Sequence, residues 1–211
     1  MKAVFFDMDG TLIDSRRDLA ASVNHTRRDL GLPELSVEDV LKNVGLGAQY
    51  LLEHSITEPI PPTFDLKATF KRHYAEHATE SVTLYPGVVE TLAELHRRGW
   101  RMGLNTAKPA FAVKAILQKF GLEHYFGSAI IAGGDCPELK PSVLPLTMCA
   151  ERMGHTVTPE DWMVGDNWTD IQCATNGKIN GAFCEFGFGQ LKDAVPTCSL
   201  KSFSELLDYL K

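Results

Sequence analysis

The chain has 211 residues, a formal net charge of −6 at pH 7, 44% hydrophobic residues and 23% charged residues. This length is enough to bury a full core, either as one large domain or as a main domain with an insertion. The acidic balance argues against a nucleic acid or an acidic membrane surface as the main partner. No segment approaches the roughly 20 apolar residues that a membrane-spanning helix needs.

The N-terminal segment and the cysteines indicate where the protein works. Asp7 and Asp9 interrupt the first apolar run before the apolar region of a signal peptide could form. The five cysteines are an odd number without a close CxxC pair, which indicates reduced thiols rather than disulfides or a zinc site. We therefore expect a cytoplasmic protein.

Residues 2–6 predict a buried strand that ends in two acids. The segment lacks alternation and is rich in β-branched and aromatic side chains, as in a strand covered on both faces of a parallel sheet. Asp7 and Asp9 follow it, and Gly10 and Thr11 allow the chain to turn at the sheet edge where α/β proteins bind ligands. Two carboxylates in different environments can act as nucleophile and proton donor, which suits phosphate ester chemistry. By itself, Asp-Gly also fits an ordinary acidic turn.

Residues 16–79 have a helical pattern without a convincing strand. Apolar residues at helical spacing predict helices over 16–30, 37–41, 50–52 and 64–77. Ser36 and Asp39 have the spacing of an N-cap and its N3 acid, which supports the second of these helices.

Strands and helices alternate after residue 87. The pattern predicts strands over 100–105, 129–132, 162–164 and 181–184, and helices over 88–98, 110–120, 142–153, 168–176 and 202–210. This alternation predicts an α/β fold with a Rossmann-like parallel sheet flanked by helices. We expect residues 1–15 and 82–211 to form this core, and residues 16–81 to form an inserted all-helical cap.

Three further polar sites follow predicted core strands. Thr106 offers a hydroxyl and a nearby N–H at an expected helix entrance, which suits a phosphoryl oxygen, although an N-cap role would explain this residue by itself. Lys140 precedes Pro141, which can open a helix as its first residue, and an ammonium fixed there can neutralise a nucleophile and a phosphoryl group. A lysine before a proline is also common in loops.

The third of these sites contains Asp166 and Asp170. Asp166 ends a strand, and Asp170 would face the same side of the next helix. Oxygen ligands suit a small, hard cation, so Asp7 and Asp166 together with backbone and substrate oxygens would suit Mg2+. The alternative is that both acids only stabilise a helix N-terminus.

Taken in chain order, these sites resemble the four motifs of the haloacid dehalogenase-like superfamily of phosphohydrolases. The motifs are DMDGTLIDS at 7–15, Thr106, Lys140 and GDNWTD at 165–170. The YPG sequence at 85–87, Gly177, the FGFG sequence at 186–189 and the position of the helical insertion are similar to the phosphoglycolate phosphatase-like branch. Ala107 stands where that branch usually has Asn.

The resemblance implies a Mg2+-dependent phosphatase that hydrolyses a small phosphomonoester, phosphoglycolate being the leading candidate. Asp7 would attack phosphorus and become an aspartyl phosphate, while Asp9 would protonate the leaving oxygen and then activate water. Thr106 and Lys140 would assist catalysis, and Mg2+ would be held by Asp7, the carbonyl of Asp9, and Asp166. The resemblance further assigns residues to substrate binding (Gly10, Thr106, Ala107, Lys140) and to supporting roles (Asp170, Asn167), with Asp170 orienting Lys140 or a metal-bound water.

The cap is expected to select the substrate. Gly45 and Gly47 open a helix with little steric hindrance, so their backbone N–H groups could approach an anionic substrate, and the family places a specificity loop here. A plain turn between helices is the alternative. Lys42 and Arg16 could meet a substrate carboxylate, although both residue types are more often surface charges. We expect a small phosphorylated metabolite as the partner, without nucleic acid or membrane, and a monomer or weak homodimer.

Other functions fit the sequence less well. A sugar phosphomutase of the same superfamily would share Asp7 and Asp9 and differ mainly in the cap, whereas a dehalogenase would lack the second acid. A non-catalytic binding protein would not need every ionisable catalytic position. The HYAEH sequence at 73–77 matches the HxxEH pattern of inverted zinc peptidases. That function would require a further acidic ligand and leaves the acids of the core unexplained.

Overall fold

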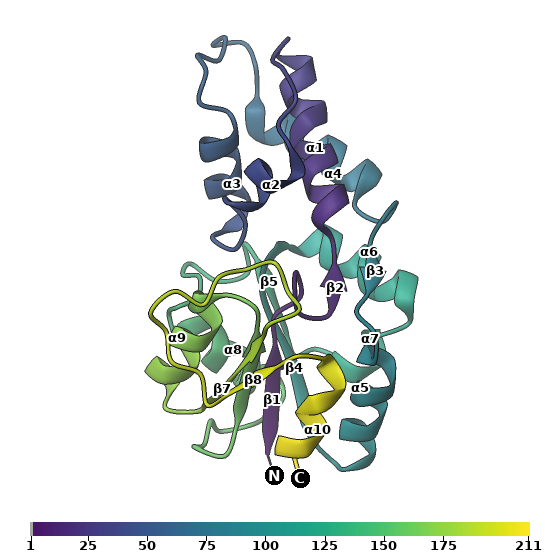
Figure 1. The fold of residues 1–211 in the computed structure, drawn as a ribbon, viewed down its shortest axis with the longest axis vertical. Coiled ribbons are helices and arrows are strands. Elements are labelled where there is room, and N and C mark those ends of the chain that lie inside the picture. Colours follow the sequence, from purple (N-terminus) through teal and green to yellow (C-terminus); the bar gives the residue numbers. More distant parts are fainter. Residues whose placement is uncertain (1) are drawn as a thin grey trace.

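A six-stranded parallel sheet forms the centre of the computed structural model, which describes residues 2–211. Because all strands run in the same direction, their carboxyl ends meet at one edge of the sheet, and this edge faces the cap in Figure 1. In spatial order the strands are β5 (Ile130–Gly133), β4 (Arg101–Pro109), β1 (Ala3–Phe6), β6 (Trp162–Gly165), β7 (Asn180–Cys184) and β8 (Cys198–Leu200).

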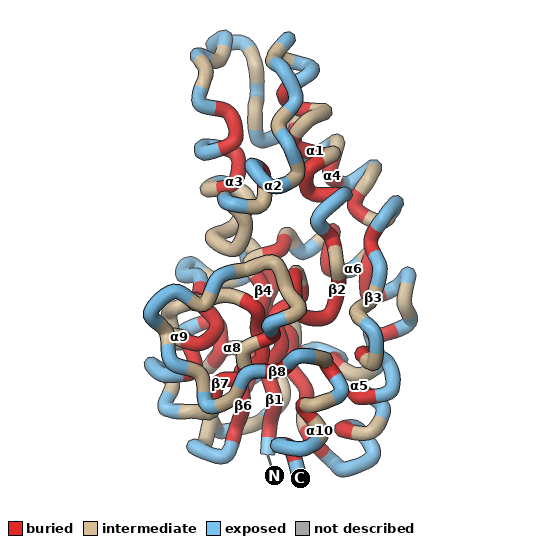
Figure 2. The backbone as a smooth tube through the Cα atoms, viewed as in Figure 1, coloured by how far each residue is buried: buried red, intermediate tan, exposed pale blue. Residues whose placement is uncertain are grey.

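Helices cover both faces of the sheet, as the pattern of strand and helix predicted. Phe5 packs with α8 and α9 on one face, and Phe6 packs with α5, α6, α7 and α10 on the other. The side chains of Phe5 and Phe6 are fully buried, and Figure 2 shows buried residues concentrated in the strands of the sheet. The bounds of the helices are α5 (Val88–Arg97), α6 (Ala110–Phe120), α7 (Glu123–Phe126), α8 (Leu144–Arg152), α9 (Trp168–Gly177), the 3-10 helix η1 (Phe203–Glu205) and α10 (Leu206–Tyr209).

Four helices form the cap, which stands above the sheet edge in Figure 1. They are α1 (Arg16–Asp29), α2 (Val37–Leu41), α3 (Gly47–Ser55) and α4 (Leu66–His77). Their apolar faces form a separate hydrophobic cluster that includes Val23, Leu52 and Phe70 and that reaches Ala112 of α6. The fold is therefore α/β with an inserted all-helical cap, as expected from the sequence.

Two chain crossings join the cap to the core, and they run side by side. Strand β2 (Ile13–Asp14) pairs antiparallel with β3 (Thr83–Leu84). The buried carboxylate of Asp18, in the first turn of α1, accepts hydrogen bonds of 2.9 Å from the backbone N–H groups of Ser81 and Val82. These contacts tie the entry of the cap to its exit.

The structure differs from the sequence prediction in several elements. Strand β4 continues to Pro109 because Asn105 pairs with Ile131 and, after an irregularity, Pro109 pairs with Gly133. The expected helix start at Pro141 is wrong: α8 begins at Leu144, whose N–H is bonded to the Ser142 hydroxyl, and a proline lies in its first turn. The short elements β2, β3, α7 and β8 were not predicted, and the expected helix over 202–210 is divided into η1 and α10.

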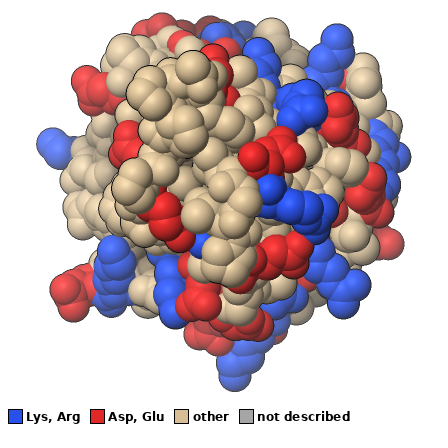
Figure 3. Space-filling model, turned by 90° about the horizontal axis from the view of Figure 1, so that it is seen from above, with Lys and Arg blue, Asp and Glu red and all other residues tan. Residues whose placement is uncertain are grey.

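The outer surface of the cap carries charges of both signs. Acidic and basic side chains are intermixed on the face seen from above in Figure 3. Among the charged residues of the cap, Lys42 pairs with Asp39 at 2.6 Å and Arg72 pairs with Asp29 at 2.8 Å. Within residues 2–211, none of the helices is long and apolar enough to cross a membrane.

Candidate active site

Three acids and one lysine meet at the carboxyl edge of the sheet. Asp7 follows β1, Asp166 follows β6, and Asp170 lies in the first turn of α9, so the topology brings all three together. One side-chain oxygen from each lies within 4.8 Å of the others. Lys140, from the loop before α8, places its Nζ atom 3.0 Å from Oδ1 of Asp7 and 2.6 Å from Oδ1 of Asp170.

Lys140 is held as a buried ammonium. Its side chain is 3% exposed, and its Nζ atom donates a hydrogen bond to the carbonyl oxygen of Asn105 at 2.8 Å. Burial disfavours the charged form, but the carboxylates of Asp170 and Asp7 outweigh burial and raise the pKa of Lys140 above its usual range. The sequence predicted this lysine, and the structure places it between two of the predicted acids.

Asp166 is fixed by the loop that follows β7. Its Oδ2 atom accepts hydrogen bonds from the backbone N–H groups of Phe188 at 2.9 Å and Gly189 at 2.7 Å. A Cβ atom on Gly10 would lie 1.8 Å from the same oxygen, and Gly10 has a φ of +74°. Only glycine fits at this position. Gly10 therefore has a clear role in making room for Asp166, whereas its expected substrate contact stays a prediction.

The neighbouring carboxylates of Asp7, Asp166 and Asp170 favour the binding of a cation between them. Burial, followed by the neighbouring Asp170 and Asp7, raises the pKa of Asp166 well above its usual value. Oδ1 of Asp7 and Oδ1 of Asp170 lie near Lys140, but neither has an aligned hydrogen-bond donor among residues 2–211. Buried oxygens without aligned donors, together with excess negative charge, fit a hard divalent ion such as Mg2+.

The side chain of Asp9 lies in different surroundings from that of Asp7. Its Oδ1 atom accepts a short hydrogen bond from the hydroxyl of Ser15, and Lys108 Nζ lies 2.7 Å from the same oxygen. Both donors go to Oδ1, so neither occupies Oδ2. The side chain of Asp9 does not join the group of Asp7, Asp166 and Asp170 that could hold a metal, so the expected contribution of Asp9 to metal binding concerns only its carbonyl.

Lys108 and Tyr74 are site residues that the sequence analysis missed. The Lys108 ammonium, with a side chain 1% exposed, also donates a short hydrogen bond to the hydroxyl of Tyr74 on cap helix α4. Burial opposes the charge of Lys108, but Asp9 and then Tyr74 raise its pKa above the usual range. Burial raises the pKa of Tyr74 to about 12, so its hydroxyl is protonated at neutral pH. The available signal was the position of Lys108, two residues after Thr106.

Thr106 lies in the site but not at a helix entrance. Helix α6 begins at Ala110, so the expected N-cap position and the helix N-terminus beside Thr106 are wrong. The buried Thr106 hydroxyl instead accepts the backbone N–H of Lys108 at 3.2 Å, within β4. Thr106 and Ala107 both line the cavity that contains Asp7 and Asp9.

The cap closes this cavity from above. Gly45 and Gly47 line it, as expected for a cap loop near the substrate, and both have a positive φ. A Cβ atom on Gly45 would lie 2.7 Å from Nδ2 of Asn167, and one on Gly47 would lie 3.1 Å from Leu139. These close approaches show that the loop rests against the core. The centre of a water molecule can reach about 50 Å³ of the cavity.

Lys42 and Arg16 are not among the residues that line the cavity. Lys42 pairs with Asp39 on the exposed side of α2, and Arg16 pairs with Asp14 at 2.6 Å. The cap lines the cavity mostly with apolar side chains, and among residues 2–211 Lys108 is the only lining residue with a positive charge. The apolar lining residues from the cap are Leu19, Leu41, Val44, Ala48, Leu51 and Phe70.

Comparison with known proteins identifies the family. A family model described as haloacid dehalogenase-like hydrolase matches residues 4–183. The phosphoglycolate phosphatase of Vibrio parahaemolyticus serotype O3:K6 is 34% identical over 99% of this chain and 95% of its own length. The phosphoglycolate phosphatase of Escherichia coli strain K12 is 34% identical over 100% of this chain and 92% of its own length. A crystal structure titled as a predicted phosphoglycolate phosphatase from Haemophilus somnus 129pt has a TM-score of 0.90 and 28% identity, covering 100% of this chain and 98% of that one. These matches confirm the resemblance drawn from the motifs: the chain belongs to the haloacid dehalogenase-like hydrolase family.

Proposed function

We propose that the protein is a Mg2+-dependent phosphatase of small phosphomonoesters, with phosphoglycolate as the leading substrate. The observation that carries this proposal is that Asp7 and Asp9 line the same cavity but have different partners. Asp7 stands beside Lys140 and two further acids, whereas Asp9 is held by Ser15 and Lys108. Two carboxylates with different partners suit two chemical roles.

Asp7 is the proposed nucleophile. Its carboxylate attacks phosphorus, the bond from phosphorus to the ester oxygen breaks, and Asp7 becomes an aspartyl phosphate. Asp9 donates its proton to the leaving oxygen. In the second step Asp9 takes a proton from water, the water oxygen attacks phosphorus, and the carboxylate of Asp7 is regenerated. Division into two displacements replaces one difficult step with two easier ones.

Lys140 and Thr106 are the proposed stabilisers of the phosphoryl group. The Lys140 ammonium is buried beside Asp7, where a positive charge counters the charge that accumulates on the phosphoryl oxygens. Its hydrogen bond to Asn105 and its ion pair with Asp170 hold it in place before substrate arrives. Thr106 adds a hydroxyl in the same cavity.

Asp7, Asp166 and the carbonyl of Asp9 are the proposed Mg2+ ligands, with Asp170 and Asn167 in support. When bound, the ion neutralises the carboxylates and the phosphoryl oxygens so that an anionic nucleophile can approach an anionic ester. Asp170 acts on Lys140 through their 2.6 Å contact. Asn167 caps α9, where its side chain accepts the N–H of Thr169, and this fixes the turn between Asp166 and Asp170.

The cavity favours a small anionic substrate over a sugar phosphate. The apolar cap residues and the limited space offer few partners for the hydroxyl groups of a hexose. Lys108 places a positive charge in the cavity lining, which suits the carboxylate of a small anionic substrate. These features support phosphoglycolate and disfavour the phosphomutase alternative. The phosphoglycolate phosphatases among the relatives support the same choice.

The free cysteines support a cytoplasmic location. Cys149, Cys173 and Cys184 are buried, and none of the five cysteines is in a disulfide. A monomer or weak homodimer remains our expectation, which sedimentation equilibrium of the purified chain would test.

Phosphate release from a panel of phosphomonoesters tests the proposed function. The panel contains phosphoglycolate, hexose phosphates and nucleotides, each assayed with Mg2+ and with a chelator. We expect Mg2+-dependent release that is fastest with phosphoglycolate. Slow release together with activation by a hexose bisphosphate would instead identify a phosphomutase, and no release from any compound by the folded protein would contradict a phosphatase.

A further inference from the structure

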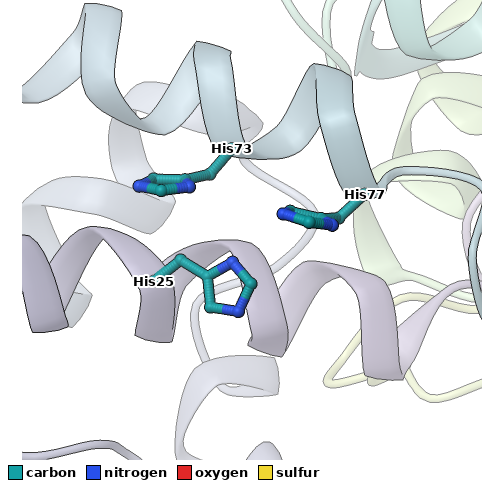
Figure 4. A group of neighbouring side chains, drawn as sticks. All are labelled: His25, His73 and His77. Carbon is teal, nitrogen blue, oxygen red and sulfur yellow. The ribbon is translucent and has the colours of Figure 1, made fainter.

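Three histidines gather in the cap, and none of them lines the active-site cavity. His25 comes from α1, and His73 and His77 come from one side of α4. Figure 4 shows the three rings together in the space between these two helices. The ring centroid of His25 lies 5.3 Å from that of His73 and 4.7 Å from that of His77. One nitrogen from each ring lies within 4.8 Å of the other two.

Carboxylates orient two of the imidazoles from outside the cluster. Nε2 of His73 lies 2.8 Å from Oδ2 of Asp29, and Nδ1 of His77 lies 2.7 Å from Oε1 of Glu80. The same oxygen of Asp29 pairs with the guanidinium of Arg72 at 2.8 Å. A histidine that binds a metal usually donates its other ring N–H to such a carboxylate.

This arrangement leaves one ring nitrogen of each oriented histidine available. Nδ1 of His73 is buried and has no hydrogen-bond partner among residues 2–211. Nε2 of His77 is the nitrogen not bonded to Glu80, and a carboxylate oxygen of Glu76 lies 3.8 Å from it. The ring of His25 supplies the third imidazole of the group and stands at interplanar angles of 72° to the ring of His73 and 84° to that of His77.

We propose that His25, His73 and His77 bind a transition-metal ion of the Zn2+ type, which links the first helix of the cap to the last. Imidazole nitrogens suit Zn2+, Ni2+ and Cu2+, whereas Mg2+ prefers oxygen. This site is therefore chemically distinct from the acids at the sheet edge. It also gives the HxxEH sequence a role other than that of a peptidase, because the third ligand is a histidine of α1.

Zn2+ titration of the full chain against a chromophoric chelator tests this proposal. Excess Mg2+ is present throughout, so that the acidic site does not compete for zinc. We expect one equivalent to bind to the wild type and to raise its Tm, because a ligand that binds only the folded state stabilises it. Zinc-edge X-ray absorption of this complex should show imidazole nitrogens at roughly 2.0 Å.

Variants separate this site from adventitious zinc binding. His25→Asn and His77→Asn should each weaken binding by at least about 10- to 100-fold, the cost of losing even an outer partner of a ligand. His54→Asn, at an exposed histidine of α3, is the matched control and should bind like the wild type. Asp29→Asn should weaken binding while keeping all three histidines. Circular dichroism establishes that each variant is folded.

Two results would overturn the proposal. The first is equal zinc affinity in the wild type, His25→Asn and His77→Asn, and the second is a zinc complex without imidazole ligands. The proposal does not depend on the proposed phosphatase function. Mg2+-dependent phosphate release is measured on the same proteins and should be unchanged in His25→Asn, so a missing phosphatase activity and a missing zinc site are separate outcomes.

Discussion

Nζ of Lys108 lies 2.7 Å from Oδ1 of Asp9, and the same ammonium donates a hydrogen bond to the hydroxyl of Tyr74. One lysine of β4 therefore joins the proposed general acid to a helix of the cap. Asp9 also accepts the hydroxyl of Ser15, which directly precedes α1. Both ends of the cap thus contact the surroundings of this carboxylate, and closure of the cap and positioning of the acid are expected to depend on each other.

Lys108→Met should lower kcat by about 100-fold, the lower end of what a positioned acid or base contributes. The substitution keeps the apolar stem but removes the charge that fixes Asp9. Lys114→Met, on the exposed side of α6, is the matched control and should keep full activity. Steady-state kinetics with the best substrate of the panel measures both. Wild-type kcat in folded Lys108→Met would show that Asp9 does not need this partner.

Tyr74→Phe should have a smaller effect, because it removes only the hydroxyl. The ring packs against Phe70 and Phe111 at centroid distances of 5.4 and 5.8 Å, and this packing remains. We expect a loss of about 1 kcal/mol in the free energy of unfolding, typical of one buried hydrogen bond, and a several-fold lower kcat. Urea denaturation and kinetics measure these values. Tyr209→Phe, at an exposed ring, provides the control; equal effects of the two substitutions would contradict the proposed link to the cap.

Lys140→Met should destabilise the protein by about 3 to 5 kcal/mol, the cost of removing one partner of a buried ion pair. The carboxylates of Asp7 and Asp170 would lose the ammonium beside them. Adding Asp170→Asn to this variant removes one of these charges and should recover part of the loss. Chemical denaturation of both single variants and the double variant, without metal, gives the coupling energy. Additive losses would mean that the two side chains do not interact.

The contribution of Asp166 to stability without metal should fall as pH rises above about 4. Burial and the neighbouring carboxylates raise the pKa of Asp166 well above the usual value of 3.8. Between these two pKa values the folded protein holds a proton that the unfolded chain has released, so the contribution of this group to stability decreases with pH. Mg2+ binds the ionised carboxyl, so its stabilising effect should grow over the same range.

Thermal unfolding of the wild type and Asp166→Asn, each with chelator and with Mg2+ at several pH values, measures this contribution. The difference between the two proteins isolates residue 166 from the other titrating groups. We expect Mg2+ to raise the Tm of the wild type more than that of Asp166→Asn. A Mg2+ effect of equal size in both proteins would place the ion elsewhere.

Gly45→Ala should raise KM by displacing the cap loop from the core. Its Cβ atom would lie 2.7 Å from Asn167, at a backbone φ of +110°. Gly31→Ala is the matched control in the same cap, because it also has a positive φ but no atom within 4 Å of the added Cβ. Both carry the cost of left-handed backbone, about 1 to 2 kcal/mol, but only the first should change KM. Equal KM values in both variants would contradict a role of this loop in substrate binding.

The sequence predicted the sheet and most of its helices because apolar patterns and glycine stops are local signals. Asp7, Asp9 and Asp166 were predicted to follow strands, and parallel strands end at one edge of a sheet, whereas the roles of Asp170 and Lys140 were implied by the family resemblance. Strand β8 and the β2–β3 pair could not be predicted from the sequence, because elements of two or three residues have too few positions to show a period.

Contacts between specific side chains also could not be predicted from local sequence patterns. The contact of Lys108 with Tyr74 joins residues 34 positions apart, and that of Lys108 with Asp9 joins residues 99 positions apart. The pairing of Lys42 and Arg16 with neighbouring acids likewise depends on side-chain geometry. His25, which lies beside His73 and His77 of the HYAEH sequence, comes from another helix, so the motif alone did not predict this group of three histidines.

Mass spectrometry of a trapped phosphoenzyme tests the central claim most directly. Asp9→Asn keeps the proposed nucleophile but lacks the group that activates water, so brief incubation with Mg2+ and the best substrate should add one phosphoryl group. Peptide mapping should place this group on Asp7, and Asp7→Asn should show neither the adduct nor phosphate release. Phosphate release that persists in Asp7→Asn, or an adduct on another residue, would contradict the account.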